Sequence, residues 1–320
     1  MTCKDGGWGR TKMHPERQRL EKVLGPSNCL GENLFFCFGK NGYIYDEKWR
    51  IIAKNWVNIF VTILNTFVLL VLHQVLMNFD PLIVNFSDSL TDFAEKTGFR
   101  VLDCSNIGGT ECWCDGDARA ELEARIAAYP AAGIHWIDTG DYHYMTRLWT
   151  ARLGVPFSLL LLDHHTDVQA PSFGIMAEVD DPLLSCGSWA REVLEKDPFL
   201  QDFTMVGIDP ALASEVEGLK VHCYTEEDLL QLPEPVFSNP VYVSLDLDVL
   251  RPEDARTNWD QGSMTLQQLK TYLEAVFARN RVLGVDICGG ITAAKGGHAE
   301  DFRINAELRN NIIELLLKIK

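Results

Sequence analysis

From Asp80 onward, apolar positions fall into short continuous runs separated by segments with helical periodicity. The runs that predict strands are residues 82–86, 98–103, 133–138, 157–163, 203–208, 219–223, 241–246 and 282–287. The clearest helical patterns cover residues 117–129, 264–280 and 300–319. Apolar strands that alternate with helices predict a parallel sheet covered by helices on both faces. We therefore expect an eight-stranded open α/β sheet, with a closed barrel as the alternative.

The first 79 residues do not follow this alternation. Residues 1–54 lack clear periodicity, and residues 55–79 contain no Asp, Glu, Lys or Arg. This apolar stretch is long enough for a transmembrane helix, although it could also be a buried or interfacial helix, or part of an extension that does not belong to the functional protein. We predict an N-terminal extension at residues 1–79 and one functional domain at residues 80–320.

Charge separates the same two parts of the chain. The net charge is −16, which argues against nucleic acid and anionic membrane surfaces as partners. Residues 1–76 carry a net charge of +4, which leaves −20 for residues 77–320. The nine scattered cysteines favour a reducing compartment. We expect a cytoplasmic protein, with membrane anchoring through residues 55–79 as the alternative.

Two of the predicted strands end abruptly in carboxylates. The run 157–162 is followed by Asp163-His-His-Thr-Asp167, and the run 241–245 by Asp246-Leu-Asp248. Buried like charges repel and lose hydration, and no basic residue stands beside them. A divalent cation, or a pair of them, removes this penalty, so the sequence predicts a metal centre.

The spacing of these residues allows them to share ions. Alternate residues of an extended chain point the same way, so Asp163, His165 and Asp167 can converge while His164 points away. A third strand, 133–138, is followed by a glycine turn that can aim His143 inward. Two imidazoles with four carboxylates favour Mn²⁺ over Zn²⁺ or copper. With bridging carboxylates, six side chains can serve two ions about 3.5 Å apart. The predicted ligands are His143, Asp163, His165, Asp167, Asp246 and Asp248.

The order of these motifs resembles the ureohydrolase superfamily, which includes arginase, agmatinase and formiminoglutamase. The motifs are Gly140-Asp-Tyr-His143, Asp163-x-His-x-Asp167, Ser244-x-Asp-x-Asp248 and Gly284-Val-Asp286-Ile, and the resemblance covers about residues 80–320. It implies a three-layer arginase-like fold with an eight-stranded parallel sheet. It also implies two Mn²⁺ ions in a hydrolase that cleaves a non-peptide C–N bond in a small nitrogenous metabolite.

The resemblance assigns roles to the predicted ligands. His143, Asp163, Asp167 and Asp246 would bind one ion, and Asp163, His165, Asp246 and Asp248 would bind the other, so that Asp163 and Asp246 bridge. The two ions would lower the pKa of a shared water, and the bridging hydroxide would attack an amidine, guanidine or amide carbon. Asp167, the expected catalytic residue, would orient that hydroxide by hydrogen bonding.

Three departures from the arginase motifs bear on which substrate the protein takes. Arginases carry a histidine that shuttles protons, but the comparable stretch 183–189 has none. Gly289 stands where arginases carry a glutamate that pairs with the guanidinium, and Tyr142 is inserted before His143. The substrate is therefore not assigned, and arginase activity is not expected. Candidate contacts lie at residues 169–173, 185–189, 258–260 and 289–298.

Other functions stay open at this point. A metal-stabilised binding protein without catalysis is the main alternative. An Asp-His-His phosphoesterase is disfavoured because here the Asp-x-Asp pair follows that motif, and a zinc deacetylase relative would use fewer carboxylates. We also expect a homo-oligomer that acts on a small molecule.

Overall fold

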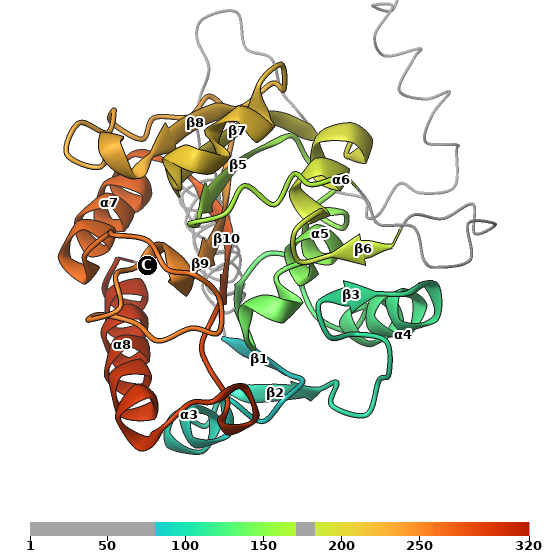
Figure 1. Ribbon diagram of the computed structural model, residues 1–320. Helices are drawn as coiled ribbons and strands as arrows, with labels where there is room; N and C mark the ends of the chain where they lie inside the picture. Colours follow the sequence, from blue (N-terminus) through green and yellow to red (C-terminus); the bar gives the residue numbers. More distant parts are fainter. Residues whose placement is uncertain (1–80, 171–182, 320) are drawn as a thin grey trace, which may run out of the picture. The chain divides into compact units, whose positions relative to one another are not determined.

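An open sheet of eight parallel strands forms the centre of the fold (Figure 1). The computed structural model describes residues 81–170 and 183–319. The strand order is β2-β1-β4-β10-β9-β5-β7-β8, and each neighbouring pair is parallel. The strands are β1 (Leu82–Asn85), β2 (Arg100–Asp103), β4 (Ile134–Ile137), β5 (Phe157–Leu162), β7 (Leu200–Ile208), β8 (His222–Thr225), β9 (Val241–Asp246) and β10 (Val282–Cys288).

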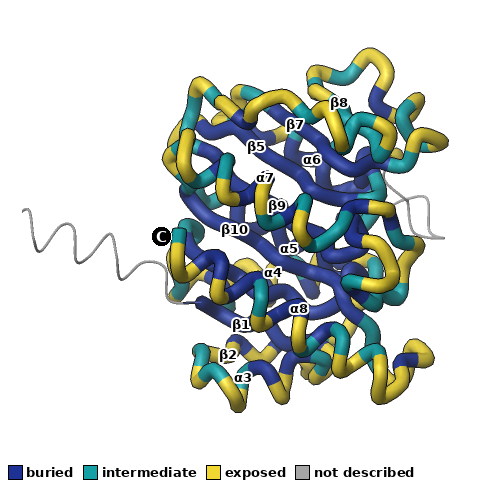
Figure 2. Tube along the Cα trace, turned by 90° about the vertical axis from the view of Figure 1, so that its left-hand side faces the viewer, coloured by how far each residue is buried: buried dark blue, intermediate teal, exposed yellow. Residues whose placement is uncertain are grey.

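The sequence prediction of the sheet is confirmed. Each of the eight predicted segments contains or overlaps one of these strands. The barrel alternative is wrong, because β2 and β8 end the sheet with one neighbour each. The central strands are buried along their length, as a sheet covered on both faces requires (Figure 2).

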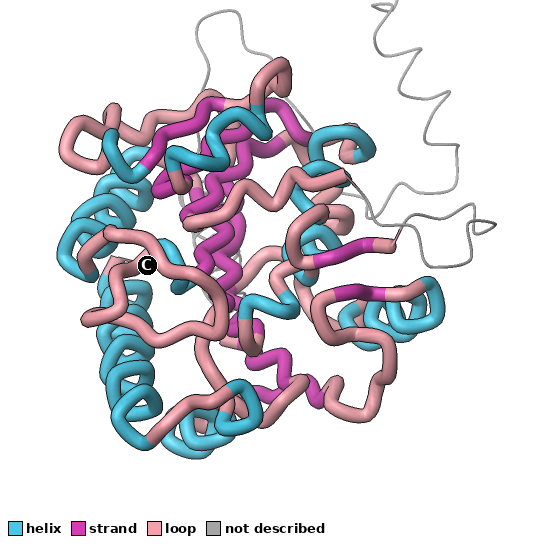
Figure 3. Tube along the Cα trace, in the orientation of Figure 1, coloured by secondary structure: helices cyan, strands magenta, loops and turns pink. Residues whose placement is uncertain are grey.

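Helices cover both faces of the sheet (Figure 3). Helices α3 (Thr91–Thr97), α7 (Leu266–Arg279) and α8 (Ala299–Lys318) contribute buried side chains to one apolar cluster. Helices α4 (Gly116–Ile126), α5 (Met145–Thr150) and α6 (Trp189–Lys196) contribute to the cluster on the other face. The three helices predicted from periodicity are confirmed as α4, α7 and α8. None of the helices in the described residues has the length and apolar character needed to cross a bilayer.

Some short elements have no signal in the sequence. Strands β3 (Trp113–Cys114) and β6 (Leu184–Ser185) form a separate antiparallel pair of two residues each. Helix α5 has only six residues, all of them buried, so it is too short for a helical period to stand out in the sequence. The predicted extension at residues 1–79, with its apolar stretch 55–79, lies outside the described residues.

The two faces of the sheet differ in polarity. On β9, Val241, Val243 and Leu245 pack in the cluster that includes α7 and α8. The intervening Tyr242, Ser244 and Asp246 therefore point to the opposite face. That face carries a column of polar groups that ends at the carboxyl edge of the sheet.

A hydrogen-bonded triad lies at the base of this column. His135 Nδ1 is 2.7 Å from Asp286 Oδ1, and the Tyr242 hydroxyl donates to the same oxygen at 2.8 Å. All three residues are at most 2% exposed, and His135 stacks on Trp149 with ring centroids 3.9 Å apart. Asp286 belongs to a motif of the sequence resemblance, but here its carboxylate supports the interior of the sheet.

We predict that Tyr242→Phe lowers the free energy of unfolding by about 1–2 kcal/mol, because Asp286 loses a buried hydrogen bond. Tyr272→Phe is the matched control, since Tyr272 is also buried and no described residue hydrogen-bonds its hydroxyl. Urea unfolding of both variants measures the difference. Equal losses of stability would show that the triad adds nothing beyond the burial of the ring.

Candidate metal centre

The predicted ligands meet at the carboxyl ends of three central strands. Asp163 follows β5, Asp246 ends β9, and His143 follows β4. These strands are neighbours in the order β4-β10-β9-β5, although they are far apart in the sequence. Ligands of open α/β sheets bind at this edge. A pocket of about 230 Å³ opens there, and all six predicted ligands line it.

A tight turn aims His143 into the pocket. The 3₁₀ turn η1 (Gly140–Tyr142) follows β4, and the His143 backbone N–H donates to the Gly140 carbonyl at 3.1 Å. The inserted Tyr142 is buried and stacks on Phe86 with ring centroids 4.0 Å apart. Its side chain therefore anchors the turn in the core while the next residue faces the site.

His143 is the centre of a first group of ligand atoms. Its Nε2 lies 2.8 Å from Ser244 Oγ, which fixes the ring. Its Nδ1 lies 3.0 Å from Asp167 Oδ2, 3.3 Å from Asp163 Oδ2 and 3.4 Å from Asp246 Oδ2. The imidazole thus presents one nitrogen to three carboxylates.

A second group forms around His165. Its Nδ1 lies 3.0 Å from Asp248 Oδ2 and 3.6 Å from Asp163 Oδ1. Asp163 therefore offers one oxygen to each group. Its Oδ2 is buried and has no hydrogen-bond partner among the described residues. Buried carboxylate oxygens without donors suit a bound cation, so the residues present fit the metal centre predicted from the sequence.

Asp246 faces only the first group directly. Its Oδ2 lies near His143, while its Oδ1 accepts a hydrogen bond from the Asp248 backbone N–H at 3.0 Å. The groups of side chains that could hold an ion include Asp246 with His143 and Cys288, but not with His165. The geometry thus agrees more closely with a bridging role for Asp163 than for Asp246.

Electrostatics explain why this cluster needs a cation. Burial, followed by repulsion from Asp163, raises the pKa of Asp167 to about 6 and also raises the pKa of Asp246. Burial and the Asp246 charge raise the pKa of Asp248 well above its usual range. Burial alone would lower the pKa of His165, but hydrogen bonds to Asp163 and Asp248 raise it to about 12. The carboxylates therefore gain from any positive charge placed among them.

Asp167 is held in one orientation. Its backbone adopts a left-handed conformation with a φ of 53°, and the Trp189 indole N–H donates to its Oδ2 at 2.5 Å. This geometry turns the carboxylate toward His143 after the strand has ended. His164 points elsewhere, as expected, with its Nδ1 2.9 Å from Glu226 Oε1.

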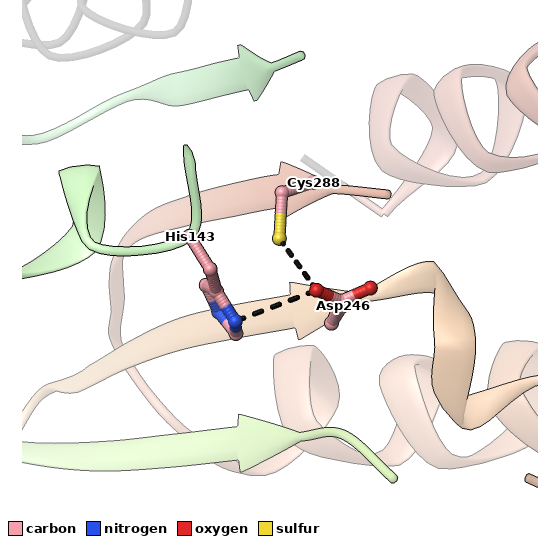
Figure 4. A group of neighbouring side chains, drawn as sticks. All are labelled: His143, Asp246 and Cys288. Atoms are coloured by element: carbon pink, nitrogen blue, oxygen red, sulfur yellow. Dashed lines mark hydrogen bonds and ion pairs between the residues drawn. The ribbon is translucent and has the colours of Figure 1, made fainter. Parts of the chain in front are cut away.

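Cys288 is a residue of the site that sequence reasoning missed. Its thiol donates to Asp246 Oδ2 at 3.0 Å, on the same side as His143 (Figure 4). Burial, followed by the Asp246 charge, raises the pKa of this thiol well above its usual range, so it stays protonated at neutral pH. Its position at the end of β10 was the available signal, because the carboxyl ends of the central strands form the site.

Only part of the segments predicted to contact the substrate lies at the pocket. Gln169, Ser185, Cys186, Gly187 and Trp259 line the pocket, whereas residues 171–173 lie outside the described residues. The segment 289–298 contributes no lining residue, and its His298 is the N-cap residue of α8 instead. Cys112 and Trp113 also line the pocket but were missed, because a strand of two residues leaves no pattern in the sequence.

Comparisons with known proteins agree with this geometry. A model described as the Arginase family matches residues 132–289. An uncharacterised protein of Thermotoga maritima is 30% identical over 157 residues, which is 49% of this chain and 58% of that protein. The chain thus covers less than two thirds of that relative.

Solved structures show the same fold at low sequence identity. Proclavaminate amidino hydrolase from Streptomyces clavuligerus is 18% identical with a TM-score of 0.55, covering 75% of this chain and 91% of that chain. Trypanosoma cruzi formiminoglutamase with Mn²⁺ is 12% identical with a TM-score of 0.53, covering 75% and 94%. Bacillus subtilis formimidoylglutamase is 13% identical with a TM-score of 0.52, covering 74% and 86%.

Fold and site together define an α/β protein with an arginase-like fold and a candidate metal centre at the carboxyl edge of its sheet. The family model covers residues 132–289, and together with the similar folds it is consistent with a divergent, arginase-like protein. The resemblance stated from the motifs is thereby confirmed.

We predict that Asp163→Asn weakens manganese binding by more than about 100-fold, above the usual range for residues that only support a ligand. The physical reason is that Asp163 faces both groups of ligand atoms. Asp209→Asn is the matched control, because Asp209 is part-exposed and lies 3.9 Å from His164 rather than in the cluster. Calorimetric titration of metal-free protein with Mn²⁺ measures both. Unchanged affinity in Asp163→Asn would exclude a shared ligand.

Proposed function

We propose that this protein is a dimanganese hydrolase that cleaves a non-peptide C–N bond in a small nitrogenous metabolite. The observation that carries the proposal is Asp163, which offers one oxygen to each of two ligand groups within one pocket. The names of proteins with similar folds support the chemistry, since they include an amidino hydrolase and a formiminoglutamase with Mn²⁺.

Each proposed ion has its own set of ligands. His143, Asp163, Asp167 and Asp246 would hold one ion. Asp163, His165 and Asp248 would hold the other, with Asp246 as the further ligand that the resemblance implies. When bound, such ions lower the pKa of a water molecule and polarise the group under attack.

The chain's own residues would orient the reaction. Asp167 is the proposed catalytic residue, because its carboxylate faces the ligand atoms and can accept a hydrogen bond from the attacking water. The Trp189 indole holds that carboxylate in place, and Ser244 holds the imidazole of His143. Both supports are buried, so the groups are fixed before substrate enters.

The substrate side of the pocket favours a neutral amide over arginine. Apart from the proposed ligands, the described lining residues carry no charge: Cys112, Trp113, Gly140, Gln169, Ser185, Cys186, Gly187 and Trp259. A buried guanidinium needs a fixed carboxylate partner, and none of these residues supplies one. We therefore do not propose arginase activity.

We also propose a cytoplasmic location and a homo-oligomeric state. The described residues contain six free cysteines, which supports a reducing compartment. The oligomeric state remains a prediction from the sequence that light scattering of the purified protein can decide.

We predict that manganese-loaded protein releases ammonia or urea from at least one member of a panel of small amides, amidines and guanidines. Asp167→Asn should lower kcat by about 10²–10³-fold, because a neutral amide replaces the charged carboxylate and is a weaker acceptor for the attacking water. Asp209→Asn should retain full activity. Two bound manganese ions without any turnover would favour a binding protein. A single bound zinc would favour a deacetylase, and phosphate release from a general ester would favour a phosphoesterase.

We predict that Gly289→Glu does not create an arginase but weakens manganese binding by about tenfold or more. A Cβ at Gly289 would lie 2.8 Å from Asp246 Oδ1 and 2.9 Å from the Leu247 backbone nitrogen. The glycine also has a φ of 106°, which side chains disfavour.

Gly296→Ala is the control for this effect. Gly296 has a φ of 94°, but no atom lies within 4 Å of its added Cβ, so it reports backbone strain without displacement of Asp246. Manganese titration and an arginine hydrolysis assay measure the three proteins. Arginine turnover by Gly289→Glu with intact metal binding would refute the steric explanation.

A further inference from the structure

Two tryptophans at the mouth of the metal pocket are exposed to an unusual degree. Trp113 is 53% exposed and Trp259 is 40% exposed, and both line the pocket. The other described tryptophans, Trp136, Trp149 and Trp189, are at most 1% exposed. When an apolar or planar ligand covers an exposed indole, apolar surface leaves water and binding becomes more favourable.

A buried carboxylate joins the segments that carry these two residues. Asp141 is 2% exposed, and its Oδ1 accepts hydrogen bonds from Trp259 Nε1 at 3.1 Å and Asn258 Nδ2 at 3.1 Å. The Cys112 thiol, next to Trp113, donates to the same oxygen at 3.3 Å. Asp141 lies two residues before His143 but belongs to none of the candidate metal-ligand groups. Its carboxylate instead connects the two sides of the pocket mouth.

The Trp259 ring lies beside His165, one of the proposed metal ligands. It lies edge-on to the His165 imidazole, with ring centroids 6.0 Å apart. Its Cδ1 would lie 2.9 Å from a Cβ added at Gly140, so the ring packs against bare backbone at the turn that aims His143. A ligand that reaches the proposed ions therefore passes this indole.

The neighbouring groups are neutral. Gln169 supplies an amide, Ser185 a hydroxyl and Cys186 a thiol to the same pocket. The Lys295 ammonium lies near the rim, but its contacts are with Glu111 and Asp141. These described groups suit the polar edge of an uncharged ligand whose face rests on an indole.

We propose that Trp113 and Trp259 bind the non-reacting part of the substrate, which is a planar, uncharged ring or conjugated group, and that Asp141 is the positioning residue for this surface. The inference rests on the proposed function, since it names the substrate class of the same site. Cleavage would then occur at a neutral amide attached to that planar group.

Three hydroxamic acids test the proposal, because all carry the same metal-binding group. Acetohydroxamic acid reports the metal centre alone. Benzohydroxamic acid adds a planar ring, and cyclohexanecarbohydroxamic acid adds a ring of similar size that is not planar. Calorimetric titration of the manganese-loaded protein should show benzohydroxamic acid binding about tenfold more tightly than the cyclohexyl compound.

Variants locate the effect. Trp113→Ala and Trp259→Ala should each bring the phenyl-to-cyclohexyl preference toward one, while acetohydroxamic acid binds as in the native protein. Trp259→Phe keeps a ring but removes the donor to Asp141, so it should lose part of the preference. Phe199→Ala is the control. Phe199 is 36% exposed and precedes β7 at the amino ends of the strands, whereas the pocket lies at their carboxyl ends.

Asp141→Asn separates positioning from folding. It should lower the phenyl preference severalfold with the affinity for acetohydroxamic acid unchanged, because one of the two oxygens becomes a donor that faces other donors. A general loss of structure would lower the affinity for all three probes together.

The outcomes separate this inference from the proposed function. Binding of all three probes with equal affinity would overturn the planar-substrate surface and leave the metal centre intact. A phenyl preference that survives both alanine variants would also overturn it. If no hydroxamic acid binds, the dimetal site and the inference that depends on it both fail.

Discussion

The burial of four carboxylates at one edge of the sheet is the constraint on which the rest of the structure depends. Asp163, Asp167, Asp246 and Asp248 are between 1% and 7% exposed, so water cannot screen their repulsion. Two imidazoles within the cluster offset part of this cost, and a divalent cation would offset much more. Parallel strands make such crowding achievable, because their carboxyl ends place residues from distant parts of the sequence side by side.

Hydrogen-bonded side chains along one face of the sheet support this cluster. Along one face, the His135–Asp286–Tyr242 triad is followed by Ser244 with His143, and then by Asp246 with Cys288. Each level supplies hydrogen bonds to polar groups at that level, while Asp163 Oδ2 at the top stays without a partner among the described residues. The opposite face of the same strands is apolar and packs on α7 and α8. One face therefore secures the fold, while the other fixes the geometry of the site.

The sequence predicted those features of the fold and the site that depend on local residue patterns. Apolar runs located all eight strands, and the carboxylates and imidazoles that follow three of them all line one pocket. Cys288, Trp113 and Asp141 were not recognised because their roles depend on contacts between distant segments. Asp141 meets Asn258 and Trp259 from a loop more than a hundred positions away. No periodicity in the chain encodes such a meeting, and β3 is too short to produce one.

The close approach of Gly289 to Asp246 bears on how the pocket can bind a substrate. Gly289 lets the end of β10 approach Asp246 so closely that no side chain fits at this position. A side chain at position 289 therefore cannot reach the substrate without displacing Asp246. The loops across the pocket present Trp113, Trp259 and neutral polar groups among the described residues, and these are the contacts proposed for the substrate. The close packing around Asp246 on one side of the pocket and the exposed indoles on the other are together consistent with the substrate contacts proposed for the two tryptophans.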